Sequence, residues 1–408
     1  MANVNLTVLA NVLKEQWPDQ VCQDATYRQS AILPYFKKIL RRAGGKQQSF
    51  GLRTYPYASG GFAAEEAPLK TPLTEQFIKP YVTLQDVYEI RSLTQASIDD
   101  SKGNLDSLIH ALTYVPESMV EHHGFRLARG MWSTGGSYPG ALGLCGGNSS
   151  STTLLLNSKF NFRKIHRQEE VDVKTTDGND VTSGGSLGIT AISTAAYTIT
   201  VGTAVTTTAT NYLAVEDEIY ADSGWKTYVW NSIPSLIGTG NVCNITASSY
   251  PEYMSKVKTS VGTLTLPKMQ EVVDYAEGHY AGTGNKTIVT SPEVLIKYAD
   301  IFLSDVRYTM DDLKKMEAGY PTNVAYRGGT MGLIPIIKDN LCPLDEMYFI
   351  NWDCLRAFYS AWMEWMDEDG SRFCRLATQR GYSLIYYSRA NTAIVNRLGC
   401  GAWTGILI

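Results

Sequence analysis

Between Val181 and Val215 the chain carries no charged residue, and Thr, Gly, Ala and Ser dominate the stretch. Alternating segments such as Tyr197–Val201 are typical of short β-strands. An uncharged, strand-forming stretch left in solvent would promote aggregation. We therefore expect it to be covered, either by a small barrel or sandwich of its own or by adjacent subunits, and we assign residues 148–224 to a β-rich insertion.

The composition indicates a protein that buries much of its surface in contacts with other chains. Its 408 residues include 36 Lys and Arg against 40 Asp and Glu, a formal net charge of −4, which excludes a generally basic nucleic-acid binder. Charged residues make up 19%, below the ~25% usual in soluble domains. The 25 Tyr and 8 Trp belong to the residue types that are enriched where proteins meet. This balance favours a permanent assembly.

Seven cysteines are spread through the chain without a C-x-x-C pair, which predicts small buried hydrophobic residues in a reducing compartment. They are Cys22, Cys145, Cys243, Cys342, Cys354, Cys374 and Cys400. No stretch approaches the ~18–20 apolar residues of a transmembrane helix, so no membrane is expected. The apolar segment Leu6–Leu13 lacks a preceding positive charge and a small-residue cleavage site. We interpret it as an amphipathic helix of a soluble, cytosolic chain.

The N-terminal region is locally basic, with seven basic residues and no acid between Arg28 and Arg53. Apolar residues at helical spacing predict a helix over Ile32–Arg42 that stops at Gly44-Gly45. The basic cluster Lys37–Arg42 fits a solvated face, a contact with an acidic partner or enclosed nucleic acid, or a membrane surface.

Residues 47–98 predict an extended hairpin. Apolar residues from Ile78 to Ile90 alternate with polar ones, which favours a long half-buried strand with Phe50–Tyr57 as its antiparallel partner. A two-stranded ribbon alone is marginal in water, so it either folds back on its own domain or is covered by a neighbouring copy.

A long helix is predicted over residues 104–133, with Asn104 as its N-cap and a kink at Pro116, where proline costs ~3 kcal/mol. The remaining chain, residues 225–408, is expected to be α/β, with helices starting near Thr265 and Ser291. An aromatic-rich amphipathic helix is expected over Leu355–Met366. Strands are expected at Thr287–Thr290, Gly332–Ile337, Met347–Asn351, Phe373–Ala377 and Ser383–Tyr387.

No motif identifies an active site, and we expect no catalytic, cofactor-binding or metal-binding residues and no enzyme. Ser186 satisfies G-x-S-x-G, but it lies in a β-prone stretch without a following helical pattern, as a nucleophile elbow would require. His122 and His123 diverge by ~100° on a helix, so helix-surface histidines are expected rather than a shared metal. The acids Glu364, Asp367, Glu368 and Asp369 are expected in a solvated turn or in ion pairs between subunits.

The order of these parts, together with several short segments, resembles the major capsid proteins of tailed bacteriophages, which share the Hong-Kong-97-type fold. The segments that carry the resemblance are Ser249-Tyr250-Pro251, Leu264-Thr265-Leu266, Ile288–Pro292, Gly332–Asp339, Met347–Asn351 and Asn396-Arg397 before Gly399. The resemblance implies an α+β chain with an N-arm, an extended β-hairpin loop, a long spine helix, peripheral and axial domains, and a β-rich insertion.

The boundaries that follow from this resemblance are an N-terminal arm at 1–46, an extended loop at 47–98 and a peripheral domain with the spine helix at 99–147. The insertion occupies 148–224, return strands 225–263, and the axial domain with a closing strand 264–408. Any scaffold would be a separate or already removed chain, because no long charged propeptide precedes the arm. A lysine–asparagine crosslink cannot be placed; Lys46, Lys70 and Lys79 are merely available.

The resemblance implies a shell subunit that self-assembles into an icosahedral phage head, in hexamers and pentamers, and encloses double-stranded DNA without sequence specificity. Its implied partners are a scaffolding protein, a portal and a decoration protein, with assembly in the host cytoplasm and a final location in the virion. Three alternatives stay open: an encapsulin-like nanocompartment shell, a serine hydrolase using Ser186, and a β-rich adhesin or tail-type binding protein.

Overall fold

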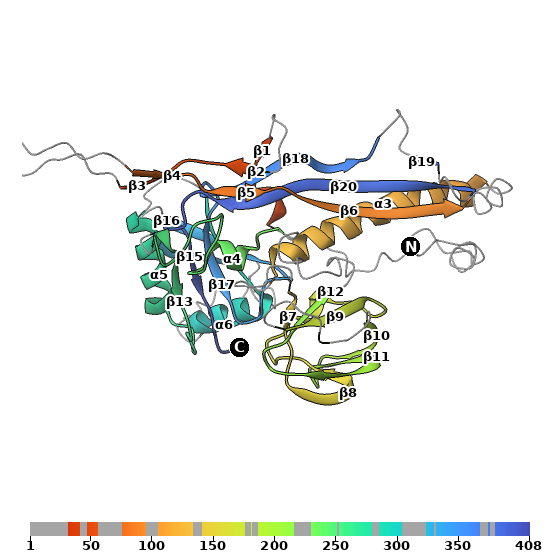
Figure 1. Ribbon diagram of the computed structural model, residues 1–408. Helices are drawn as coiled ribbons and strands as arrows, with labels where there is room; N and C mark the ends of the chain where they lie inside the picture. The colour runs from red at the N-terminus through yellow and green to blue at the C-terminus, as the bar shows by residue number, and fades with distance from the viewer. Residues whose placement is uncertain are drawn as a thin grey trace, which may run out of the picture.

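The computed structural model describes residues 32–40, 47–55, 76–94, 105–133, 141–175, 181, 187–215, 230–250, 253–279, 285–303, 324–329, 332–367, 374–375 and 380–408. Three sheets organise these residues: a long sheet with a helix along it, a mixed sheet with two helices, and a separate sheet formed by the insertion (Figure 1). A narrow ribbon of paired strands extends from one end of the long sheet (Figure 1).

The long sheet is built on β20 (Gly381–Ile394), which pairs with β18 (Leu355–Trp365), β6 (Gln85–Thr94) and β19 (Cys374–Arg375). β1 (Lys37–Leu40) adds to β18 in parallel. The helix α3 (Leu105–Met131) runs along one face of the sheet (Figure 1). A small apolar cluster joins the two, with Val115 and Met119 of α3 against Leu93, Leu384 and Tyr386. The predicted long helix is thus confirmed, and Pro116 lies inside it.

The mixed sheet has the order β13-β21-β17-β14-β16-β15 and carries α5 (Leu266–His279) and α6 (Pro292–Leu303). Its strands are β13 (Lys256–Lys258), β14 (Lys286–Thr290), β15 (Val324–Gly329), β16 (Gly332–Lys338), β17 (Met347–Asn351) and β21 (Gly401–Trp403). The Ser291 hydroxyl accepts from the Val294 amide at 3.3 Å and caps α6, as the Ser-Pro-Glu pattern predicts. The α/β prediction for this region is confirmed for both helices and for the three strands that contain the predicted segments 287–290, 332–337 and 347–351.

The insertion, together with β7 just before residue 148, forms a six-stranded sheet with its own core, in the order β7-β12-β9-β10-β11-β8. The strands are β7 (Gly143–Leu144), β8 (Asn148–Leu155), β9 (Glu170–Lys174), β10 (Leu187–Ser193), β11 (Thr198–Thr207) and β12 (Tyr212–Val215). Within the uncharged stretch, Ile189, Ile199 and Val201 are buried in this core. The larger apolar side chains of the stretch are therefore covered by its own module, the first of the two arrangements expected, while many of its Thr, Ser, Gly and Ala residues are exposed.

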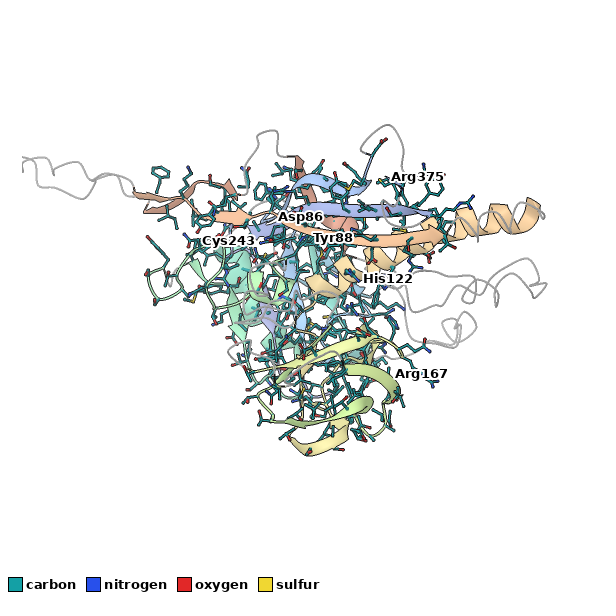
Figure 2. All side chains as sticks on the ribbon, turned by 45° about the vertical axis from the view of Figure 1, so that its right-hand side comes forward. Asp86, Tyr88, His122, Arg167, Cys243 and Arg375 are labelled. Carbon is teal, nitrogen blue, oxygen red and sulfur yellow. The ribbon has the colours of Figure 1, made fainter. Side chains whose placement is uncertain are left out.

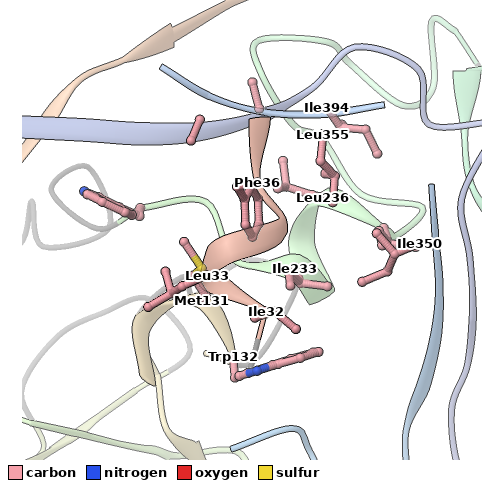
Figure 3. Packing of buried hydrophobic residues seen from close by; sticks show 14 of the residues in the cluster. Ile32, Leu33, Phe36, Met131, Trp132, Ile233, Leu236, Ile350, Leu355 and Ile394 are labelled. Carbon is pink, nitrogen blue, oxygen red and sulfur yellow. The ribbon is translucent and has the colours of Figure 1, made fainter. Parts of the chain in front are cut away.

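A large apolar cluster joins α3, the long sheet and the mixed sheet (Figure 3). Met131 and Trp132 at the end of α3 pack against Ile32 and Leu33 from the N-terminal region (Figure 3). The short helix α4 (Ile233–Leu236) closes the cluster, and Ile350 and Leu355 bring in β17 and β18 (Figure 3).

Two predicted helices are wrong. Over Ile32–Arg42 the described residues form a single 3-10 turn, Leu33–Tyr35, followed by β1. Pro34 is the second residue of that turn, and pairing with the edge of β18 outweighs the weak helical preference of so short a segment. Leu355–Met366 is the strand β18 rather than an amphipathic helix, because it is inserted between β1 and β20.

Candidate assembly surfaces

The ribbon is made by two consecutive antiparallel pairs. β2 (Gln47–Ser49) pairs with β5 (Tyr81–Thr83), and β3 (Leu52–Tyr55) pairs with β4 (Gln76–Ile78). The predicted hairpin is confirmed over these strands, while residues 56–75 lie outside the described part. Phe77 on β4 is 64% exposed. An aromatic side chain left this open on a narrow ribbon favours contact with another chain.

The long sheet has a second face, opposite α3, which we call the outer face. It carries Asp86, Tyr88 and Ile90 of β6 beside Arg389, Tyr387 and Ile385 of β20, each pair directly opposite in the register. Tyr88 and Ile90 are 37% and 42% exposed, and Arg389 Nε lies 3.5 Å from Asp86 Oδ1. Figure 2 shows Asp86 and Tyr88 on the sheet. Within the described strands β6 pairs only with β20, so the outer face ends at a ten-residue edge strand.

A polar seam connects α3 to the inner side of the sheet. Glu89 on β6 accepts from His122 Nδ1 at 2.8 Å, and Arg126 Nε lies 3.2 Å from the same oxygen, Oε1. Burial alone would raise the pKa of Glu89, but the hydrogen bond with His122 and the charge of Arg126 lower the pKa below 4.5 overall. The seam therefore holds an ionised carboxylate between the helix and the strand.

His123 departs from the expected helix-surface position, because its side chain is fully buried. Its Nε2 lies 2.8 Å from Ser388 Oγ on β20, and its ring meets Tyr386 edge-on at 5.1 Å. Burial lowers the pKa of His123 to about 4. Only His122 of the adjacent pair is partly exposed (Figure 2). The sequence pattern places both histidines on a helix. It does not show which of the two faces the sheet.

A buried junction joins α3, the insertion and the mixed sheet. The fully buried Lys164 Nζ donates to the carbonyl oxygen of Trp132 at 2.6 Å. Asn161 Nδ2 donates to the carbonyl oxygens of Asn340 and Cys342, both at 2.8 Å. Burial lowers the pKa of Lys164 to about 8 and raises that of Glu346 to about 7. Sequence reasoning missed this junction, since single Lys and Asn residues give no periodic signal.

The basic cluster is only partly described. Lys37 and Lys38 on β1 are exposed, and Lys38 Nζ lies 4.6 Å from the ring centroid of Trp362. Arg41 and Arg42 lie outside the described residues. The described part of the cluster thus places two exposed cations, Lys37 and Lys38, on the edge strand of the long sheet. This position is compatible with each of the interpretations given above.

The structure does not assemble the catalytic constellations considered from sequence. Ser186 lies outside the described residues, and the chain directly after it forms β10, a strand and not the helix that a nucleophile elbow needs. Glu364 and Asp367 are exposed at the end of β18, so their expected position at a helix end is wrong. Glu368 and Asp369 are outside the described part.

No group of three His, Cys, Asp or Glu side chains among the described residues could hold a metal ion. Five of the six described cysteines are buried, as predicted, and Cys374 is half-buried. None of the described helices combines the length and apolar composition needed to cross a membrane.

The chain resembles solved phage capsid structures over nearly its whole length. A chain of the cyanophage A-1(L) capsid asymmetric unit aligns with a TM-score of 0.59 at 10% identity, covering 98% of this chain and 99% of that one. Two further structures also align: the capsid of an empty GTA particle (TM-score 0.49, 10% identity, 98% of this chain and 99% of that one) and Mycobacterium phage Adephagia (TM-score 0.46, 12% identity, 100% and 99%). No protein-family model and no curated protein matches the chain. The first alignment shows that this chain has the fold of a phage capsid chain.

Proposed function

We propose that this chain is a major capsid protein, which self-assembles into the icosahedral head shell of a tailed phage and encloses double-stranded DNA. The observation that carries the proposal is the alignment with a chain of the cyanophage A-1(L) capsid asymmetric unit, which covers 98% of this chain and 99% of that one. The resemblance expected from sequence order is thereby confirmed at the level of the fold.

The exposed surfaces support a subunit that is completed by its copies. The ribbon with Phe77 extends from one end of the molecule, whereas the outer face with Tyr88 and Ile90 lies along the sheet (Figures 1 and 2). Two different apolar surfaces on one chain favour head-to-tail contacts, which close into rings. We infer that the ribbon of one copy covers the sheet of the next, and stable interfaces of this kind bury ~2,000 Å² or more.

The Hong-Kong-97-type division is part of this proposal. The N-arm would comprise residues 1–46, the extended loop 47–98, the peripheral domain 99–147 with return strands 225–263, and the axial domain 264–408. The insertion is proposed at 148–224. The ribbon, the long sheet with α3, the insertion sheet and the mixed sheet support this order, although β6 within 47–98 belongs to the long sheet.

The proposed partners are many copies of this chain in hexamers and pentamers, with a scaffolding protein, a portal and a decoration protein. Assembly would take place in the host cytoplasm and end in the virion. Enclosed DNA needs only sequence-blind phosphate contacts, for which the exposed Lys37 and Lys38 are suited.

Electron microscopy of the purified chain, with and without its coexpressed scaffold, tests the proposal. We expect closed icosahedral particles, whereas a discrete trimer would support the adhesin alternative and a stable monomer would refute assembly. Nuclease-protected DNA inside particles from infected cells separates a phage head from an encapsulin-like compartment, which would hold protein cargo. Ester hydrolysis that disappears in Ser186→Ala would instead support the hydrolase.

A further inference from the structure

β18 does not follow β20 in one continuous register. From Leu355 to Tyr359 it keeps one alignment, with Tyr359 opposite Ala390. The alignment shifts by one residue before Ala361, which lies opposite Arg389, and by one more before Glu364, which lies opposite Tyr387. β18 therefore contains two bulges, each of which inserts one extra residue and bends the strand.

The second bulge is strained. Met363 has a φ of 53°, a left-handed conformation that costs roughly 1–2 kcal/mol for a residue with a side chain. The Met363 amide donates to Ser388 Oγ at 3.0 Å, so the strained backbone is tied to β20. Such strain persists only where the surroundings impose it.

α3 reaches the same hydroxyl. His123 Nε2 lies 2.8 Å from Ser388 Oγ, and both side chains are fully buried. Burial lowers the pKa of His123 to about 4; the charge of Glu89 opposes this, and that of Arg126 adds to it. The ring is therefore neutral near pH 7, so Ser388 can donate to Nε2 while it accepts from Met363.

We propose that Met363, Ser388 and His123 form a conformational latch, in which α3 holds β18 in a strained, bulged register against β20. Release of the latch lets the end of β18 slide by two residues along β20, about 7 Å. The helix, the bulge and the register are then a single two-state element.

The end of β18 is compatible with both registers, because a slide of two residues keeps Glu364 and Trp365 on their own faces. Between the bulges Ala361 changes face: it lies opposite Arg389 in the bulged register and would lie opposite Ser388 in the straight one. In the bulged register Trp365 lies opposite Tyr386 and Glu364 opposite Tyr387. The register of Leu355–Tyr359, continued without bulges, would place Trp365 opposite Leu384 and Glu364 opposite Ile385. Leu384 and Tyr386 are both buried against α3, whereas Ile385 and Tyr387 both lie on the outer face. A slide of one residue would instead turn Glu364 toward α3.

The latch acts on the surface proposed for assembly. Trp362, beside the strained residue, contacts Trp230 at 5.8 Å and Lys38 at 4.6 Å, so movement of the bulge disturbs β1 and the outer end of the sheet. A role for the latch in assembly rests on the proposed function, because identical chains in five- and six-membered rings would need long sheets of different curvature. The register itself can be measured on the unassembled chain.

Cysteine pairs distinguish the two registers directly. Glu364→Cys with Tyr387→Cys should form a disulfide in the bulged register, and Glu364→Cys with Ile385→Cys in the straight one, because cross-strand pairs lie within disulfide reach. Full-length protein is treated with a mild oxidant, and the native cysteines are separated from the engineered pair by peptide mass spectrometry. We expect the 364–387 product alone in the otherwise unchanged chain.

Ser388→Ala, added to each pair, tests the latch. Loss of two hydrogen bonds should raise the 364–385 product about tenfold or more. Met363→Gly and Met363→Ala both remove the packed side chain, but only glycine relieves the left-handed strain, so the glycine variant should melt at a higher temperature than the alanine variant and leave only the 364–387 product. The latch is refuted if Ser388→Ala leaves the pair ratio unchanged or if Met363→Gly melts below Met363→Ala. Particle formation by electron microscopy, scored separately, reports on the shell proposal alone.

Discussion

Lys164 and Glu346 lie on different modules, yet each shifts the other's titration at the junction beside Trp132. Lys164 belongs to the insertion, and Glu346 precedes β17 of the mixed sheet and accepts from the Tyr348 hydroxyl. Burial disfavours both charges, and the opposite charge offsets only part of that cost. The junction that joins the insertion to the mixed sheet thus includes two buried groups, Lys164 and Glu346, whose charged forms are destabilised by burial.

Glu346→Gln should stabilise the chain above neutral pH. The raised pKa of Glu346, about 7 against 4.5, means that its contribution to stability is complete below pH 4.5 and is lost as the pH rises through 7. Urea unfolding should give a gain of about 2 kcal/mol at pH 8 that falls below about 1 kcal/mol near pH 5. Asp353→Asn, at an exposed carboxylate after β17, is the control. Parallel pH profiles for Glu346→Gln and wild type would contradict the assignment.

Glu89→Gln should have the opposite pH dependence. The lowered pKa of Glu89 gives stability that is present above 4.5 and is lost as the pH falls through the folded-state value. We expect a loss of about 2 kcal/mol at pH 7, because Arg126 and His122 on α3 lose their carboxylate partner, and a smaller loss in acid. Asp86→Asn on the exposed face is the matched control. An equal loss at both pH values would mean that packing, rather than charge, is affected.

Phe77→Gln should leave the subunit folded and impair assembly. The side chain is 64% exposed, so its loss costs the isolated chain little, while a neighbouring copy loses an aromatic contact. Lys79→Gln, on an exposed residue two positions along, is the control. Circular dichroism reports folding and negative-stain microscopy counts shells; normal particles from Phe77→Gln would count against the ribbon as a contact between copies. Deletion of residues 59–70, outside the described part, is the stronger version of this test.

Gly401→Ala should destabilise the mixed sheet. A Cβ at this position would lie 2.3 Å from Val272 Cγ1 of α5 and 3.1 Å from the Lys256 carbonyl oxygen of β13. Overpacking of this kind costs about 1–3 kcal/mol, measurable by thermal unfolding. Gly202→Ala on β11, where nothing lies within 4 Å, should be neutral. Equal melting temperatures for the two variants would show that α5 moves aside freely.

Much of the fold follows from regular periodicity. The long helix carries a regular hydrophobic period, whereas β14 and β17 of the mixed sheet are short strands buried at every residue. β18 shows why periodicity fails elsewhere. Its buried residues face both sides of the sheet, so they do not alternate with exposed ones and fall at helix-like spacings; they are Leu355, Ala357, Phe358 and Ala361. A strand that is covered on both faces thus loses the alternation by which a strand is recognised.

The polar contacts were less accessible to sequence reasoning than the elements that carry them. His123 is hydrogen-bonded to Ser388, and Asn391 Nδ2 donates to the Thr83 carbonyl oxygen. Both pairs are far apart in sequence, so no local sequence pattern predicts them. The exposed Phe77 was recognisable only as one aromatic residue among many, because exposure depends on which neighbours fail to cover it.

The parallel pairing of β1 with β18 has a consequence for synthesis of the chain. Residues 37–40 find their partners at 356–359, and β6 finds its partner only in residues 381–390. During translation β1 and β6 therefore lack these partner strands until about three hundred further residues have been synthesised. A polypeptide that ends before these residues therefore lacks the partner strands of both β1 and β6 and cannot complete the long sheet.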